Sequence, residues 1–123
     1  MAFIFRLIMK KELRVRKNEE FGQIIGKKHS LASGSFVIYF AKRADGAHAR
    51  VGLSVSKKLG NAVVRNRIKR QVRMMFISDF DYAACPYDLI VIVRNNFLQA
   101  DFAANRKDLE KLIKKVIIKK YEN

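Results

Sequence analysis

The feature that most limits the fold of this chain is a nearly continuous apolar run between Tyr87 and Arg94, which contains Asp88-Leu89-Ile90-Val91-Ile92-Val93. The run has the length of a β-strand, and a strand that is apolar on both sides is covered by other elements on both faces. The centre of a sheet offers such a position. The sequence therefore predicts a layered core built around residues 87–94.

Capping and spacing signals predict a first and a last helix. The first runs from about Asn18, which can cap it, to Ile25, and Gly26 can close it in a left-handed conformation. The last runs from Asp101, as its cap, to about Tyr121, with apolar residues at helical spacing along one side. Each helix is therefore expected to pack one apolar face on the core.

Two further strands are predicted at Ser35 to Lys42 and at Ala49 to Ser56, with a hairpin loop over residues 43–48 between them. The first strand is rather apolar on both faces, whereas the second has one small and polar face. The order of elements predicts an α/β fold, a two-layer sandwich in which helices pack on a small mixed sheet. We expect a single domain over residues 1–123, with residues 1–13 as a loosely ordered extension.

The segment from Gly60 to Arg73 combines an apolar helical rhythm with five cations in the nine residues 65–73. A helix over this segment, capped by Asn61 and ending near Ile77, would bury one apolar side. The residues of that side are Val64, Ile68, Val72, Met75 and Phe76. Like charges three or four residues apart weaken an isolated helix by about 0.2–0.5 kcal/mol per pair, so binding of a polyanion is the simplest compensation.

The composition of the chain indicates the same class of ligand. Lys and Arg number 26 against 11 Asp and Glu, which gives a formal net charge of +15 and a pI near 10.3. No acidic residue lies between Asp45 and Asp79, the interval that holds the basic helix. Because 50% of the residues are hydrophobic, the chain can build a core and is not a disordered basic tail. These properties are typical of a globular nucleic-acid-binding protein.

Other classes of function find little support in the sequence. Cys85 has no partner for an intramolecular disulfide, which favours a reducing cytoplasm. His29 and His48 have no spacing that indicates a catalytic triad or a metal site, and the acidic residues form no paired-carboxylate motif. We therefore predict no catalytic residue and no metal ligand in the chain. The apolar stretch of residues 1–9 is too short to span a membrane, which needs about 20 apolar residues.

The residues from Val51 to Arg70 resemble the signature of a known family, the bacterial ribonuclease P protein subunit. The matching elements are Ser56-Lys57-Lys58, Gly60-Asn61 and Arg65-Asn66-Arg67 in fixed register. Residues 16–21 are similar to the family's entry into its first helix, and residues 36–39 to its first strand. The resemblance covers about residues 14–94 well and the last helix only in pattern.

The resemblance implies a function. In that family the protein joins a large catalytic RNA, and the holoenzyme removes the 5′ leader of precursor tRNA by Mg²⁺-dependent hydrolysis. The RNA performs the chemistry, so the resemblance implies Mg²⁺ as a cofactor of the holoenzyme and none bound by this chain. It implies the catalytic RNA and the leader as partners, with neither a membrane nor DNA, and a cytoplasmic location. It also implies a left-handed βαβ crossover, whereas strand–helix–strand units are ordinarily right-handed.

Two surfaces follow from the resemblance. RNA phosphates would be contacted by Lys57, Lys58, Arg65, Asn66, Arg67, Lys69, Arg70 and Arg73. The alternative is a solvated basic face. The leader would lie in a cleft between the first helix and the sheet, at Phe21, Ile25, Phe36 and Tyr39. For Phe21 and Phe36 the alternative is an ordinary place in the core. Family members often carry an aromatic residue where this chain has Ile25.

Two hypotheses of other classes remain open at this point. One is a ribosomal structural protein that stays bound to rRNA and has no substrate. The other is a nuclease whose active site lies in the protein itself. The first would co-purify with rRNA, and the second would cleave RNA without an RNA partner.

Overall fold

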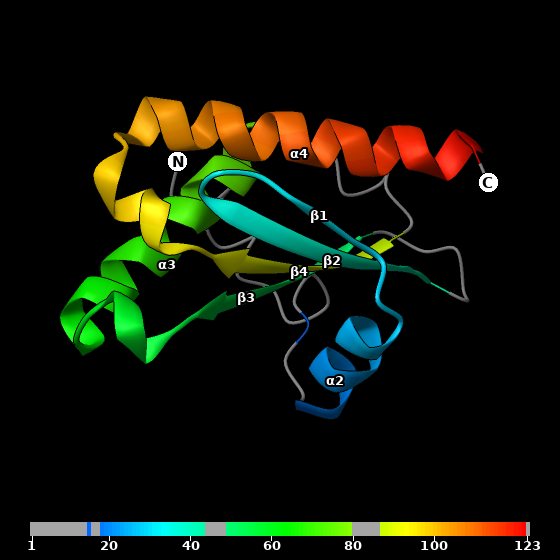
Figure 1. Ribbon diagram of the computed structural model, residues 1–123, viewed down its shortest axis with the longest axis horizontal. Helices are drawn as coiled ribbons and strands as arrows, with labels where there is room; N and C mark the ends of the chain where they lie inside the picture. Colours follow the sequence, from blue (N-terminus) through cyan, green and yellow to red (C-terminus); the bar gives the residue numbers. More distant parts are fainter. Residues whose placement is uncertain (1–14, 16–17, 44–48, 80–86, 123) are drawn as a thin grey trace.

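The computed structural model describes residues 15, 18–43, 49–79 and 87–122. In chain order these form α2 (Asn18–Gly26), β1 (Ser30–Ala32), β2 (Phe36–Lys42), β3 (Arg50–Val55), η2 (Lys57–Leu59), α3 (Ala62–Asp79), β4 (Tyr87–Val93), η3 (Asn95–Gln99) and α4 (Phe102–Glu122). The predicted extension of residues 1–13 lies outside the described residues, as do His48 and Cys85. Figure 1 shows α3 and α4 on one side of the sheet and α2 on the other.

The four strands form one mixed sheet in the order β1-β2-β4-β3. β4 pairs antiparallel with β2 and parallel with β3, and β1 pairs antiparallel with β2. The prediction of a central strand at residues 87–94 is confirmed, because β4 has a strand on each side and is buried along almost its whole length.

The predicted hairpin between the strands at 35–42 and 49–56 is wrong. β4 lies between β2 and β3, so these strands do not pair with each other, and residues 44–48 lie outside the described part of the chain. The most apolar strand takes the interior position and separates two strands that are neighbours in sequence. A β1–β2 hairpin exists instead, in which Ser33 N–H donates to Phe36 O at 2.8 Å.

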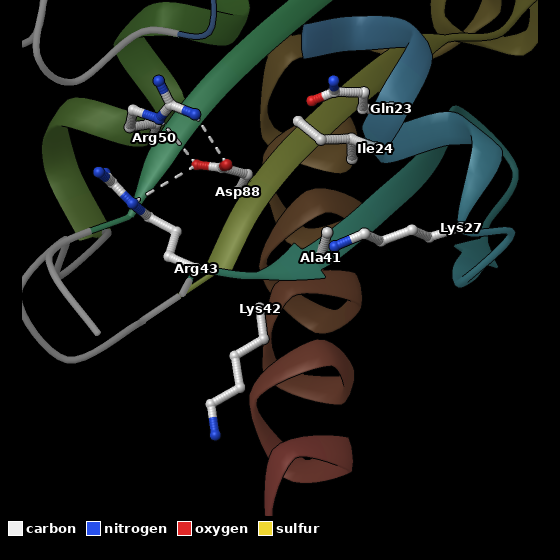
Figure 2. Close-up of a pocket in the computed structure, with 8 residues that line it drawn as sticks. All are labelled: Gln23, Ile24, Lys27, Ala41, Lys42, Arg43, Arg50 and Asp88. Atoms are coloured by element: carbon white, nitrogen blue, oxygen red, sulfur yellow. Dashed lines mark hydrogen bonds and ion pairs between the residues drawn. The ribbon is translucent and has the colours of Figure 1, made fainter. Parts of the chain in front are cut away.

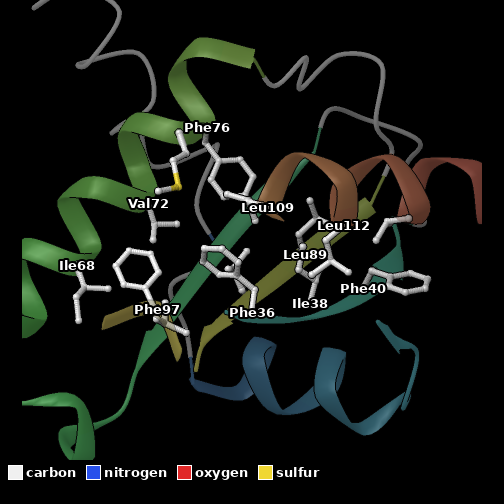
Figure 3. Close-up of a cluster of buried hydrophobic side chains, with 14 of the residues drawn as sticks. Phe36, Ile38, Phe40, Ile68, Val72, Phe76, Leu89, Phe97, Leu109 and Leu112 are labelled. Atoms are coloured by element: carbon white, nitrogen blue, oxygen red, sulfur yellow. The ribbon is translucent and has the colours of Figure 1, made fainter. Parts of the chain in front are cut away.

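The core is divided by the sheet into two apolar clusters. The larger cluster lies between the sheet and the pair α3 and α4, where Ile38, Leu89 and Leu112 are almost completely buried (Figure 3). The smaller one, which contains Ile24 and Ile90, lies under α2. The predicted α/β class with a small mixed sheet is therefore confirmed. Helices cover both faces, however, so the fold has three layers and not two.

Two predicted helix caps are confirmed. Asn61 Oδ1 accepts a hydrogen bond from Val64 N–H at 3.0 Å, and Asp101 Oδ1 accepts one from Ala104 N–H at 2.8 Å. The predicted left-handed closure at Gly26 is wrong. Gly26 is the last residue of α2, and the positive φ of 59° falls two residues later, at Lys28.

Candidate nucleic-acid interface

The basic helix α3 is anchored by one apolar side. Ile68, Val72 and Phe76 are at most 3% exposed, and Val64 is half-buried against the same cluster. This burial fixes the rotation of the helix about its axis. The opposite side consequently presents Asn66, Arg67 and Arg70 to solvent.

The short helix η2 places two more cations beside the start of α3. Ser56 Oγ accepts a hydrogen bond from Lys58 N–H at 3.2 Å, and Leu59 is buried, so Lys57 and Lys58 are left exposed. Gly60 then turns the chain with φ of 149°, a conformation that side chains with a Cβ rarely adopt. A Cβ at this position would lie 2.9 Å from Val64 Cβ, so the approach of the loop to α3 also requires glycine.

Most cations of this region are not neutralised by the part of the chain that the structure describes. Among the described residues, Lys57, Lys58, Arg67 and Arg70 form no ion pair. The remaining cations of the set, Arg65, Lys69 and Arg73, are half-buried. The η2–α3 surface, as we call Lys57, Lys58 and residues 65–73 of α3, therefore carries a concentrated positive charge that is available to a polyanion.

Three of the four residues predicted for the second surface lie together. Phe21 and Ile25 of α2 and Tyr39 of β2 are half-buried on the α2 side of the sheet. We call these three residues the α2–sheet surface. The fourth prediction, Phe36, is wrong, because its side chain is 0% exposed in the cluster on the opposite face. Alternation along β2 sends Phe36 and Tyr39 to opposite sides of the sheet.

Gly52 of β3 is a further residue of this surface, and sequence reasoning did not assign it a role. A Cβ at Gly52 would lie 2.7 Å from Phe21 Cζ and 2.8 Å from Ile90 Cδ1. The missing side chain thus allows the Phe21 ring to lie directly on β3. The only signal in the sequence was the small and polar face of this strand.

We expect Gly52→Ala to lower the free energy of unfolding by about 1–3 kcal/mol, because the added methyl group overpacks the contact with Phe21. Gly22→Ala is the matched control. Gly22 lies in α2 with no atom within 4 Å of the added Cβ, and this change should stabilise the helix by about 0.5–1 kcal/mol. Urea denaturation of both variants measures the difference. Equal free energies of unfolding for the two variants would show that the Phe21 ring does not need the space that Gly52 leaves.

An ion-pair cluster that the sequence did not predict ties α2 to the sheet. Arg50 donates from Nε and Nη2 to the two carboxylate oxygens of Asp88, at 2.9 and 2.8 Å (Figure 2). Arg50 Nη1 also lies 2.7 Å from Glu20 Oε2. Arg43 Nε lies 4.0 Å from Asp88 Oδ1. The hydrogen bonds with Asp88 raise the pKa of Arg50 above its usual range; burial opposes this rise, and Glu20 adds to it.

The described residues offer no group of three or more His, Cys, Asp or Glu side chains that could hold a metal ion. In the same part of the chain, no helix has the length and apolar character that crossing a membrane requires.

The fold and the η2–α3 surface define a class, that of a small basic α/β protein with a solvent-exposed cationic helix. The family model described as Ribonuclease P matches residues 9–117. A ribonuclease P protein component of Mesoplasma florum is 44% identical over 106 residues, which cover 85% of this chain and 96% of that protein. One of Geobacillus kaustophilus is 43% identical over 107 residues, covering 87% and 88% respectively.

Solved structures agree with these relatives. A mutant RNase P protein of Staphylococcus aureus with defective mRNA degradation activity superposes with a TM-score of 0.80 at 38% identity, covering 91% of this chain and 94% of that one. The RNase P protein of Thermotoga maritima gives 0.71 at 32% identity, covering 83% and 96%. The chain belongs to the bacterial ribonuclease P protein family. It is a component of the ribonuclease P endoribonuclease, an RNA-binding ribonucleoprotein of tRNA processing.

Proposed function

We propose that this chain binds the catalytic RNA of ribonuclease P and the 5′ leader of precursor tRNA, and so assists removal of the leader. The observation that carries this proposal is the η2–α3 surface, where four exposed cations have no ion pair among the described residues. A helix held by its buried side presents these charges in a fixed arrangement. Cations so placed reduce the repulsion between the phosphates of two RNA molecules.

The leader lies, in this proposal, on the α2–sheet surface at Phe21, Ile25 and Tyr39. The half-buried rings of Phe21 and Tyr39 offer apolar faces on which single-stranded bases can stack, at about 1–3 kcal/mol per base. Ile25 supplies apolar contact without a ring and should contribute less. Phe36 has no part in this surface.

Hydrolysis belongs to the RNA subunit in this proposal, and Mg²⁺ acts there. The protein's contribution is electrostatic and positional. In this proposal the holoenzyme is cytoplasmic. Residues 1–123 act as one RNA-binding domain, in which residues 1–13 are an extension. The crossover from β3 through α3 to β4 is left-handed. An experimental structure of the holoenzyme would check the hand and the extension directly. Membership of the family favours this function over the ribosomal and nuclease alternatives.

The proposal is tested by reconstitution. The purified chain is added to a bacterial ribonuclease P RNA, and cleavage of a precursor tRNA with a 5′ leader is measured across Mg²⁺ concentrations. We expect the chain to stimulate cleavage most at low Mg²⁺, where phosphate repulsion is least screened. Leader cleavage that is unchanged at every Mg²⁺ concentration would refute the proposal. Cleavage by the protein alone would point to the nuclease alternative.

Arg67→Ala should weaken RNA binding and flatten its salt dependence. The side chain is exposed on α3 and has no ion pair among the described residues, so its loss removes a phosphate contact without a structural cost. The slope of log K against log salt should fall by about 0.7–0.9 for one lost contact. Lys111→Ala, an exposed position on α4, is the charge-matched control. An unchanged slope for Arg67→Ala would place this residue away from the RNA.

A further inference from the structure

Two consecutive residues of α2 are held by two residues on one face of β3. The Glu20 carboxylate lies 2.7 Å from Nη1 of Arg50. The next residue, Phe21, has its Cζ 2.7 Å from the position that a Cβ of Gly52 would occupy. Residues two apart in a strand point to the same side of the sheet, so Arg50 and Gly52 both face α2. A charged contact and an aromatic contact therefore lie next to each other where α2 begins.

The Arg50 guanidinium is a fixed anchor for the charged contact. Arg50 is the register partner of Asp88 in the parallel pairing of β3 and β4, and it donates to both carboxylate oxygens of Asp88 (Figure 2). A planar guanidinium held by two parallel hydrogen bonds keeps one orientation. Its remaining amino group, Nη1, is consequently directed to one place above the sheet, and Glu20 occupies that place.

Apolar packing specifies the placement of α2 less sharply. Among residues 19–26 of this nine-residue helix, Ile24 is buried, whereas Phe21 and Ile25 are only half-buried. Apolar contacts are non-directional, so a short helix can shift along them at little cost. An ion pair with a fixed partner resists such a shift, because its energy depends on the distance between two atoms.

We propose that Glu20 is a positioning residue for the leader. Through Arg50 it holds the first turn of α2 so that Phe21, the next residue, presents its ring to a base of the 5′ leader. Glu20 itself binds no RNA, since a carboxylate repels phosphates. The role in leader binding rests on the proposed function, whereas the positioning of the Phe21 ring does not.

The first experiment tests the positioning without RNA. The Gly52 Hα protons lie against the Phe21 ring, so their NMR shifts report on where the ring stands. Glu20→Gln should change these shifts, because it breaks the link to Arg50. Glu19→Gln is the charge-matched control, since Glu19 is exposed in the same turn and forms no ion pair with any described residue. Gly52 shifts that are the same in both variants would overturn the positioning.

The second experiment tests the consequence for the leader. Each variant is assembled with a ribonuclease P RNA, and its affinity is measured for precursor tRNA and for the same tRNA without the leader. The ratio of the two affinities cancels any general effect of the lost negative charge. Glu20→Gln should lower this ratio by about two- to fivefold, the worth of a partly exposed ion pair, and Glu19→Gln should leave it unchanged. An equal loss for both RNAs would overturn the proposal.

A double-mutant cycle with Phe21→Leu tests whether Glu20 acts through the ring. Phe21→Leu should lower the ratio by itself, and Glu20→Gln added to it should lower the ratio no further, because the ring to be positioned is gone. Additive effects would overturn the assignment to Phe21. A ratio that Phe21→Leu leaves unchanged would refute the leader surface of the proposed function, and with it the role of Glu20 in leader binding. The Gly52 shifts distinguish that outcome from a failure of the positioning itself.

Discussion

Phe36→Ala should lower the free energy of unfolding by about 3–5 kcal/mol, as truncation of a fully buried aromatic residue does. The Phe36 side chain is 0% exposed beneath α4, and its ring packs edge to face on Phe97 of η3 with centroids 5.7 Å apart (Figure 3). Alanine would leave a cavity that the surrounding residues of the buried cluster fill only partly. Urea denaturation of the purified variant measures the loss.

A matched pair of leucine variants then separates the core from the leader surface. Phe36→Leu keeps most of the buried volume, so this variant should fold and bind the leader as the unsubstituted chain does. Tyr39→Leu removes a half-buried ring from the other face of the same strand. It should weaken leader binding by about 1–3 kcal/mol, the value of one stacked base. Weaker leader binding by Phe36→Leu with normal stability would restore Phe36 to the RNA site.

The outcome at Phe36 shows what a pattern of residues can and cannot determine. Along β2 both faces are apolar, because one covers the main core and the other packs under α2. Alternation therefore separates Phe36 from Tyr39 but does not say which of them is fully covered. That answer depends on helices far away in sequence, since α4 lies over one face and the shorter α2 over the other.

Elements whose signals are local could be predicted well. The caps at Asn61 and Asp101 and the buried side of α3 follow from residues within a few positions of each other. The order of the strands could not be predicted in this way. The pairing of β4 between β2 and β3 depends on contacts between residues 38 to 57 positions apart in the chain. A short loop between two strands is compatible with a hairpin or with a separated pair.

The candidate site, too, could be predicted only where its residues are close together in sequence. The cations of the η2–α3 surface are contiguous in sequence, so their clustering is visible without a structure. The cluster of Arg50, Asp88 and Glu20 joins three elements, with Arg50 and Asp88 brought side by side by the parallel register of β3 and β4. In the sequence these are isolated charges at the ends of elements.

Arg50→Met should destabilise the fold by about 3 kcal/mol, because it leaves Asp88 without its main partner. We take the lower end of the range for a broken buried ion pair, since 22% of the Arg50 side chain is exposed and Arg43 lies 4.0 Å from the same carboxylate. Methionine preserves the length and apolar packing of the arginine stem, so the loss reports chiefly on the charge. Urea denaturation at neutral pH measures it.

A double-mutant cycle decides whether the loss arises from the ion pair. Asp88→Asn added to Arg50→Met removes the unpaired charge, so the double variant should be more stable than the sum of the single effects allows, by about 1–3 kcal/mol. Glu20→Gln provides the comparison within the cluster. Its carboxylate is 28% exposed and meets Arg50 through one amino group, so its loss should cost about 0.2–1 kcal/mol. Strict additivity of Arg50→Met and Asp88→Asn would mean that the ion pair between β3 and β4 contributes nothing to the stability of the fold.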